Sequence, residues 1–114
     1  MKIEAGKAYL FWQMYDEYEV ARKEIGTQRV KNIEQYAKKY ENLTNEEADA
    51  LVKASMEVQK SFIGLWEKTY KNMSKSISPI TAAQFLQAEM FFENMFRQEL
   101  STDIPLIGEF DIKK

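Results

Sequence analysis

Apolar side chains recur at helical spacing, in steps of three or four residues or of two such steps, along the first third of the chain from Ala8 to Tyr40. The series is Ala8, Phe11, Tyr15, Tyr18, Ile25, Ile33, Tyr36 and Tyr40. Such spacing places the apolar side chains on one face of an α-helix. The pattern predicts a long helix over about 3–40. We expect it to continue through Gly26, although glycine inside a helix costs about 1 kcal/mol relative to alanine.

A second helix is predicted over about 45–75, and its start is marked by a capping box. In the segment Thr44-Asn45-Glu46-Glu47, the Thr44 hydroxyl can accept from a first-turn amide while the Glu47 carboxylate reaches back to the Thr44 amide. Gly64 lies inside this helix and would permit the close approach of a neighbouring helix.

A third helix is predicted over about 79–100. Ser78 is a favoured N-cap residue and Pro79 a favoured first helical residue. This segment is apolar on nearly all sides, so more than one of its faces must be buried against other helices. Two partner helices would supply that cover, or one helix of this chain together with another chain.

After the third helix, Pro105 disfavours helical backbone at Ile104, which predicts an extended C-terminal tail. We expect the apolar residues of Ile104–Ile107 to lie across the helices, and residues 1–2 and 109–114 to be frayed.

The predicted helix lengths imply an elongated molecule. At about 1.5 Å per residue the two long helices would span roughly 55 and 45 Å. A compact domain of this length has a radius of gyration of only about 13 Å. We therefore expect an all-α single domain over 1–114, in which an antiparallel hairpin of two long helices carries the shorter third helix.

The charge distribution offers little attraction for nucleic acid. The net charge is −2, and residues 79–114 carry more acidic than basic side chains, which opposes binding to a phosphate backbone. No apolar run is long enough to predict a transmembrane segment.

The chain contains no cysteine and no histidine. It therefore lacks thiolates, the commonest general base and the commonest transition-metal ligand. We expect no catalytic residue, no cofactor and no metal site. The acidic pair Glu89 and Glu93 and the cluster Glu46, Glu47 and Asp49 could in principle hold a hard cation, but solvation and helix capping explain them more simply.

Two groups of large side chains are candidates for binding. The aromatic stripe of Tyr9, Trp12, Tyr15, Tyr18, Phe62 and Trp66 is either an apolar cradle or ordinary helix packing. The cluster Met90, Phe91, Phe92, Met95 and Phe96 is either an adaptable binding surface or core and dimer interface. The candidate partner-binding or dimer surface is Tyr9, Trp12, Trp66, Met90, Phe91 and Met95.

Two arginines, Arg22 and Arg29, occupy positions on the apolar face of the first helix. They would either bind an anionic partner or form ion pairs with acidic side chains of a neighbouring helix, and the second interpretation is favoured.

Nearly the whole chain resembles the Spy/CpxP-like family of small helical periplasmic proteins, and in particular an uncharacterised bacterial branch of it. The segments that carry the resemblance are Phe11-Trp12 with Tyr15, Glu17-Tyr18 and Arg22; Tyr36 to Ala48; Ile77-Ser78-Pro79 with Ala83 and Phe85; and Glu99-Leu100 with Ile104-Pro105-Leu106.

The family pattern Leu-Thr-x-x-Gln is matched here by Leu43-Thr44-x-x-Glu47, with Glu in place of Gln. Its second copy departs further, because Ile77-Ser78-Pro79 is not followed by the glutamine. Ile80-Thr81-x-x-Gln84 matches the letters, but it would put Thr81 inside the first helical turn.

The resemblance implies a periplasmic protein, often a dimer that forms a cradle, and some members act as chaperones without ATP. Metal-sensing members use histidine, which is absent here. We therefore expect a non-enzymatic, homodimeric protein that binds unfolded clients, or alternatively a regulatory or structural protein of envelope stress signalling that docks on one envelope protein. A carboxylate-bound metal carrier is the third interpretation. The sequence itself shows no signal-peptide pattern, so the periplasmic location is implied by the resemblance alone.

Overall fold

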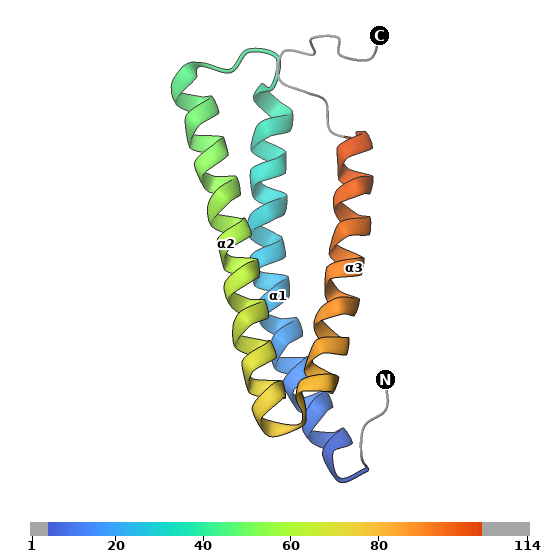
Figure 1. Cartoon of the computed structure of the whole chain (residues 1–114). Helices are drawn as coiled ribbons and strands as arrows, with labels where there is room; N and C mark the ends of the chain where they lie inside the picture. The colour runs from blue at the N-terminus through green and yellow to red at the C-terminus, as the bar shows by residue number, and fades with distance from the viewer. Residues whose placement is uncertain (1–4, 104–114) are drawn as a thin grey trace.

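The computed structural model describes residues 5–103, which form three α-helices in an up-down-up arrangement (Figure 1). They are α1 (Ala5–Lys39), α2 (Asn45–Ser76) and α3 (Pro79–Asp103). The molecule measures 56 × 29 × 16 Å, with a radius of gyration of 17.8 Å. The predicted all-α, elongated architecture is confirmed. The extended tail and the frayed ends that the sequence predicts lie outside the described residues.

Helix α1 is continuous through Gly26, as predicted. A Cβ atom added at Gly26 or at Gly64 of α2 would meet nothing within 4 Å. Neither glycine therefore permits a close contact among the described residues, and the expectation of a close helix approach at Gly64 is wrong.

The junction between α1 and α2 is held by polar contacts of the α2 N-terminus. The Thr44 hydroxyl accepts from the Glu47 backbone N–H, and the Glu47 carboxylate accepts from the Thr44 backbone N–H, each at 3.1 Å. The same carboxylate pairs with the Lys39 ammonium at 2.6 Å. These contacts lower the pKa of Glu47, with the Lys39 hydrogen bond as the largest cause and the Thr44 backbone bond second. The predicted capping box is thus present.

The junction between α2 and α3 is a tight turn at Ile77 and Ser78. The Ser78 hydroxyl accepts from the Thr81 backbone N–H at 3.1 Å, and α3 begins at Pro79 as predicted. The Lys7 ammonium of α1 donates to the Ile77 carbonyl at 3.0 Å, which fastens the start of α1 to this turn.

The main hydrophobic core lies at the same end of the molecule. Its buried residues come from all three helices and the turn, and are Phe11, Tyr18, Met73, Ile77, Ala82 and Phe85. The Phe85 ring meets the Tyr18 and Tyr15 rings edge-on, at 5.0 and 6.2 Å between centroids. This aromatic contact joins α3 to α1.

Helix α2 is the only one of the three described helices that packs closely against both others. No Cα atom of α1 lies within 8 Å of a Cα atom of α3. Figure 1 shows the helices converging where α2 turns into α3, whereas the other end of α3 stands apart from α1. Only long side chains span the space between α1 and α3.

Candidate functional site

The space between α1 and α3 is an open groove of about 770 Å³. The walls come from α1 and α3, and the Phe62 and Trp66 side chains of α2 form the floor. The α1 wall is lined by Tyr15, Tyr18, Glu19, Arg22, Lys23, Gly26, Thr27, Arg29 and Val30, and the α3 wall by Glu89, Phe92, Glu93 and Phe96. This volume lies within the range of about 300–1,000 Å³ that is usual for ligand pockets.

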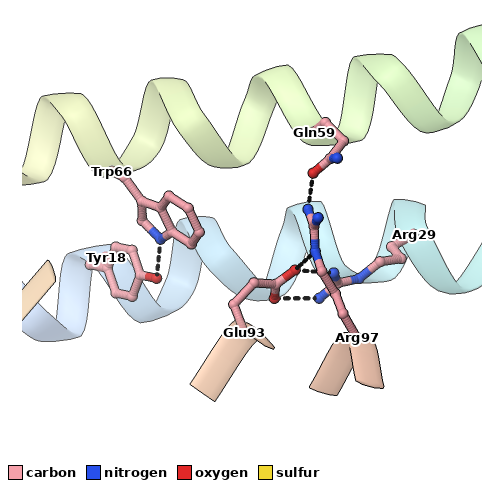
Figure 2. A network of polar contacts seen from close by, with 6 residues as sticks. All are labelled: Tyr18, Arg29, Gln59, Trp66, Glu93 and Arg97. Carbon is pink, nitrogen blue, oxygen red and sulfur yellow. Dashed lines mark hydrogen bonds and ion pairs between the residues drawn. The ribbon is translucent and has the colours of Figure 1, made fainter. Parts of the chain in front are cut away.

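A chain of hydrogen bonds crosses the end of the groove nearest the core. The Trp66 indole N–H donates to the Tyr18 hydroxyl at 3.1 Å (Figure 2). The Tyr18 hydroxyl in turn donates to the Glu89 carboxylate at 2.9 Å. Burial raises the pKa of Tyr18, which keeps the phenol protonated as a donor. Burial also raises the pKa of Glu89 and outweighs the hydrogen bond from Tyr18, which lowers it.

Further from the core, an ion-pair network connects α1 to α3 across the groove. The Arg29 guanidinium of α1 donates two hydrogen bonds to the Glu93 carboxylate of α3, at 2.6 and 3.1 Å. Arg97 donates to the same carboxylate at 2.9 Å and also to the Gln59 side chain of α2 (Figure 2). Burial opposes ionisation of Glu93, but the bonds from the two arginines outweigh it and lower the pKa of this carboxyl.

Arg29 is also held by aromatic rings on two sides. Its guanidinium carbon lies 4.7 Å from the centroid of the Phe62 ring and 4.6 Å from that of Phe96. A guanidinium at this distance is attracted by the ring face. The prediction that Arg29 pairs with an acid on a neighbouring helix is confirmed. For Arg22 the prediction is wrong, because its guanidinium pairs with Glu19 of α1 itself, at 2.8 Å.

Apolar side chains in the groove walls are largely open to solvent. Phe92 is 60% exposed, Val30 52% and Phe96 40%, whereas Phe62 beneath them is buried. Gly26 lies in the α1 wall with open space before it. The groove thus combines an aromatic floor, uncovered apolar walls and charged groups that pair largely with one another.

The structure separates the sequence-predicted binding residues into four places. Trp66 lies in the groove floor. Trp12 is 57% exposed and touches the Tyr15 ring edge-on, so it extends the aromatic lining beyond the groove. Tyr9 is 79% exposed near the start of α1. Met90, Phe91 and Met95 are exposed on α3 outside the groove lining.

Sequence reasoning did not assign Phe92, Glu89 and Glu93 to a common site. A signal was present, because two acids stand four residues apart in the apolar series of the third helix, while two arginines stand seven residues apart in that of the first. Charged residues on facing helix seams indicate pairing across the interface.

The described residues contain no group of three or more acidic side chains arranged to hold a metal ion. Glu89 and Glu93 are each engaged with side chains of the chain itself. Within the part of the chain that the structure describes, no helix has an apolar stretch sufficient to cross a membrane.

The arrangement is suited to noncovalent binding. It offers aromatic and aliphatic surface, and it holds the neighbouring charges in fixed pairs. The chain was compared with protein-family models, with curated proteins and with solved structures, and none of the three comparisons found a match.

Proposed function

We propose that this protein is a non-enzymatic periplasmic binding protein that takes apolar segments of unfolded or envelope proteins into the groove between α1 and α3. The observation that carries the proposal is the set of exposed apolar side chains above an aromatic floor. Covering Phe92, Phe96 and Val30 removes apolar surface from water, at about 25 cal/mol per Å². The resemblance to the Spy/CpxP-like family supports the periplasmic location.

The absence of histidine and cysteine supports the non-enzymatic part of the proposal. Serine or threonine would need a base to act as a nucleophile. The carboxylates of the groove are poor candidates for that base, since Glu93 is held by arginines and Glu89 accepts from Tyr18.

An aggregation assay with an unfolding client protein tests the proposal. Wild type at stoichiometric amounts should suppress light scattering, and Phe92→Ser should weaken the suppression. The matched control is Phe91→Ser, because Phe91 is equally exposed, at 60%, but does not line the groove. Lack of protection by wild type would refute chaperone-like binding. Equal loss in both variants would move the site to the outer face of α3.

A second function is favoured by the outer face of α3, where Met90, Phe91 and Met95 are 45–60% exposed. This face would serve a regulatory or structural protein of envelope stress signalling that docks on one specific envelope protein. A pull-down from envelope extract that yields one partner, lost in Phe91→Ser and kept in Phe92→Ser, would favour this function over general client binding.

The same outer face is our proposed homodimer contact, because a second copy would cover it. Sedimentation equilibrium at micromolar concentration should then show a dimer, and Phe91→Ser should shift the protein toward monomer. A wild-type protein that is monomeric throughout would refute the dimer.

A further inference from the structure

The groove contains a carboxylate that forms no ion pair. Four of the six charged side chains in the groove lining form the two ion pairs described above. The remaining two are Glu89 on the α3 wall and Lys23 on the α1 wall, and within the described residues neither forms an ion pair. Lys23 is exposed, so water solvates its ammonium, whereas Glu89 is half-buried. Glu89 is therefore the charge in the groove that a partner would neutralise with most effect.

The Glu89 carboxylate is held at one oxygen and is open at the other. The Tyr18 hydroxyl donates to Oε2 at 2.9 Å, which fixes the orientation of the side chain. Oε1 accepts no hydrogen bond from the described residues. In this part of the chain no fully buried side-chain oxygen or nitrogen lacks a partner, so Oε1 is reached by solvent. Because Glu89 lines the groove, a donor that enters the groove can reach this oxygen.

The charges around Glu89 do not compensate for its burial. Burial is the largest cause of its raised pKa. The hydrogen bond from Tyr18 and the charge of Arg22 lower the pKa, and the carboxylates of Glu19 and Glu93 raise it. The net rise shows that the ionised carboxylate is disfavoured in the free protein. A cation beside it would favour the ionised form, and it would cause less additional desolvation here than at a fully hydrated acid.

Aromatic surface lies on several sides of Glu89. Tyr15, Trp66 and Phe92 line the same groove. Phe92 follows Glu89 by three residues on α3, which places the two side chains on one face of the helix. The Trp66 indole donates to the hydroxyl of Tyr18, the same hydroxyl that donates to Glu89. Aromatic ring faces attract ammonium and guanidinium groups, and the apolar stems of lysine and arginine lie readily on apolar surface.

We infer that the groove selects client segments in which a lysine or arginine lies among apolar residues, and that the basic group pairs with Glu89. The apolar neighbours in such a segment would contact the exposed Phe92 and Val30 side chains. The inference rests on the proposed function, because it names the class of segment that the groove binds.

Binding of three end-capped peptides at pH 7 tests the inference. They share one short leucine- and serine-rich sequence and differ at the central residue, which is lysine, acetyl-lysine or glutamate. Acetylation keeps the stem of lysine and removes its charge. Fluorescence anisotropy of labelled peptides should give a Kd about tenfold lower for the lysine peptide than for the acetyl-lysine peptide, as expected for one hydrogen bond between charged groups. Equal affinities, or tighter binding of the glutamate peptide, would overturn the inference.

Two protein variants locate the source of the preference. Glu89→Gln should bring the Kd values of the lysine and acetyl-lysine peptides to within about twofold of each other, because only the charge of the acceptor changes. Glu57→Gln removes the same charge from an exposed site outside the groove lining and should keep the tenfold preference. A preference that survives Glu89→Gln, or that is lost equally in both variants, would overturn the assignment to Glu89.

Carboxyl-carbon NMR of Glu89 supplies a readout that a purely structural role would not move. A proton and a bound cation compete for the same carboxylate, so a saturating lysine peptide should lower the pKa of Glu89. The acetyl-lysine peptide should not lower it. An unchanged pKa in the complex with the lysine peptide would contradict the proposed contact.

The variant Phe92→Ser separates this inference from the proposed function. If the lysine and acetyl-lysine peptides bind equally and Phe92→Ser weakens both, the groove binds apolar segments without regard to charge, so the inference fails and the proposed function stands. If the lysine peptide binds in a manner that depends on Glu89 while Phe92→Ser changes neither affinity, the pairing with Glu89 stands and the apolar groove function fails. Absence of binding by all three peptides would contradict both.

Discussion

The ion pair between Arg29 and Glu93 offers the sharpest test of how α3 is held against α1. We consider Glu93→Gln, which keeps the size of the side chain and removes its charge. Glu93 accepts three hydrogen bonds, two from Arg29 and one from Arg97. The Glu93 side chain is 11% exposed and that of Arg29 18% exposed, so water replaces these bonds poorly.

The expected loss of unfolding free energy is about 2–3 kcal/mol. A hydrogen bond to a charged group contributes about 1.5–3 kcal/mol. Glutamine retains one acceptor oxygen, so part of the pairing with Arg29 survives. The bond from Arg97 adds little, because that side chain is 46% exposed and exposed pairs contribute about 0–1 kcal/mol. For a domain of this size the loss corresponds to a fall in Tm of roughly 8–12 °C.

Urea unfolding followed by circular dichroism measures this loss. The control is Glu57→Gln, which breaks a pair with Lys60 in which both side chains are 74% exposed, and it should cost less than about 0.5 kcal/mol. A Glu93→Gln loss as small as that of the control would refute the reasoning.

Replacing both members of the pair provides a second test. Removal of one charge from a buried pair leaves the other charge buried and unpaired, whereas apolar replacement of both side chains often leaves the unfolding free energy unchanged. The double variant Arg29→Met with Glu93→Leu should therefore lose less unfolding free energy than the two single variants lose together. Additive losses in the double-mutant cycle would show that the two side chains act independently.

Three further predictions concern single positions. Burial raises the pKa of Glu89, so the stability that its protonated carboxyl contributes is present at low pH and is lost as the pH rises through the folded-state pKa. Glu89→Gln should therefore raise Tm at pH 7 and give no gain below pH about 4. A gain in Tm that persists at low pH would contradict the assignment. Gly64→Ala should raise the unfolding free energy by about 0.5–1 kcal/mol in urea titrations, because the added Cβ atom meets open space; a loss would indicate a contact at that face. Thr44→Ala removes the acceptor for the Glu47 backbone N–H and should lower the unfolding free energy by about 1 kcal/mol, and an unchanged value would show that the α2 N-terminus does not depend on its cap.

Local signals in the sequence were sufficient for the helix boundaries. Thr44 and Glu47 form the predicted capping box, and Pro79 is the first residue of α3. These contacts involve residues three or four apart, so the segment itself contains both partners. The end of α3 was predicted less well, at about 100 instead of Asp103, although Pro105 disfavours helical backbone at Ile104, directly after the observed end.

The candidate site depended on contacts that a single helix does not specify. Periodicity identified Arg22 and Arg29 as seam positions, yet the first pairs within α1 and the second reaches Glu93 on α3. Both partners are acids at compatible spacing, so sequence spacing alone favours neither. Glu89 of α3 accepts from Tyr18 instead of Arg22, whereas Glu93 accepts from Arg29.

The sequence by itself determined three helices, their caps, the elongated shape and the lack of histidine and cysteine chemistry. Only the tertiary structure decided that α2 packs against both other helices while α1 and α3 stay apart, which creates the groove. Amphipathic periodicity states which face of a helix is buried, but not the distance or angle at which a neighbour meets it. That geometry makes Phe62 a buried floor and leaves Phe92, on an equally apolar stretch, exposed in the wall.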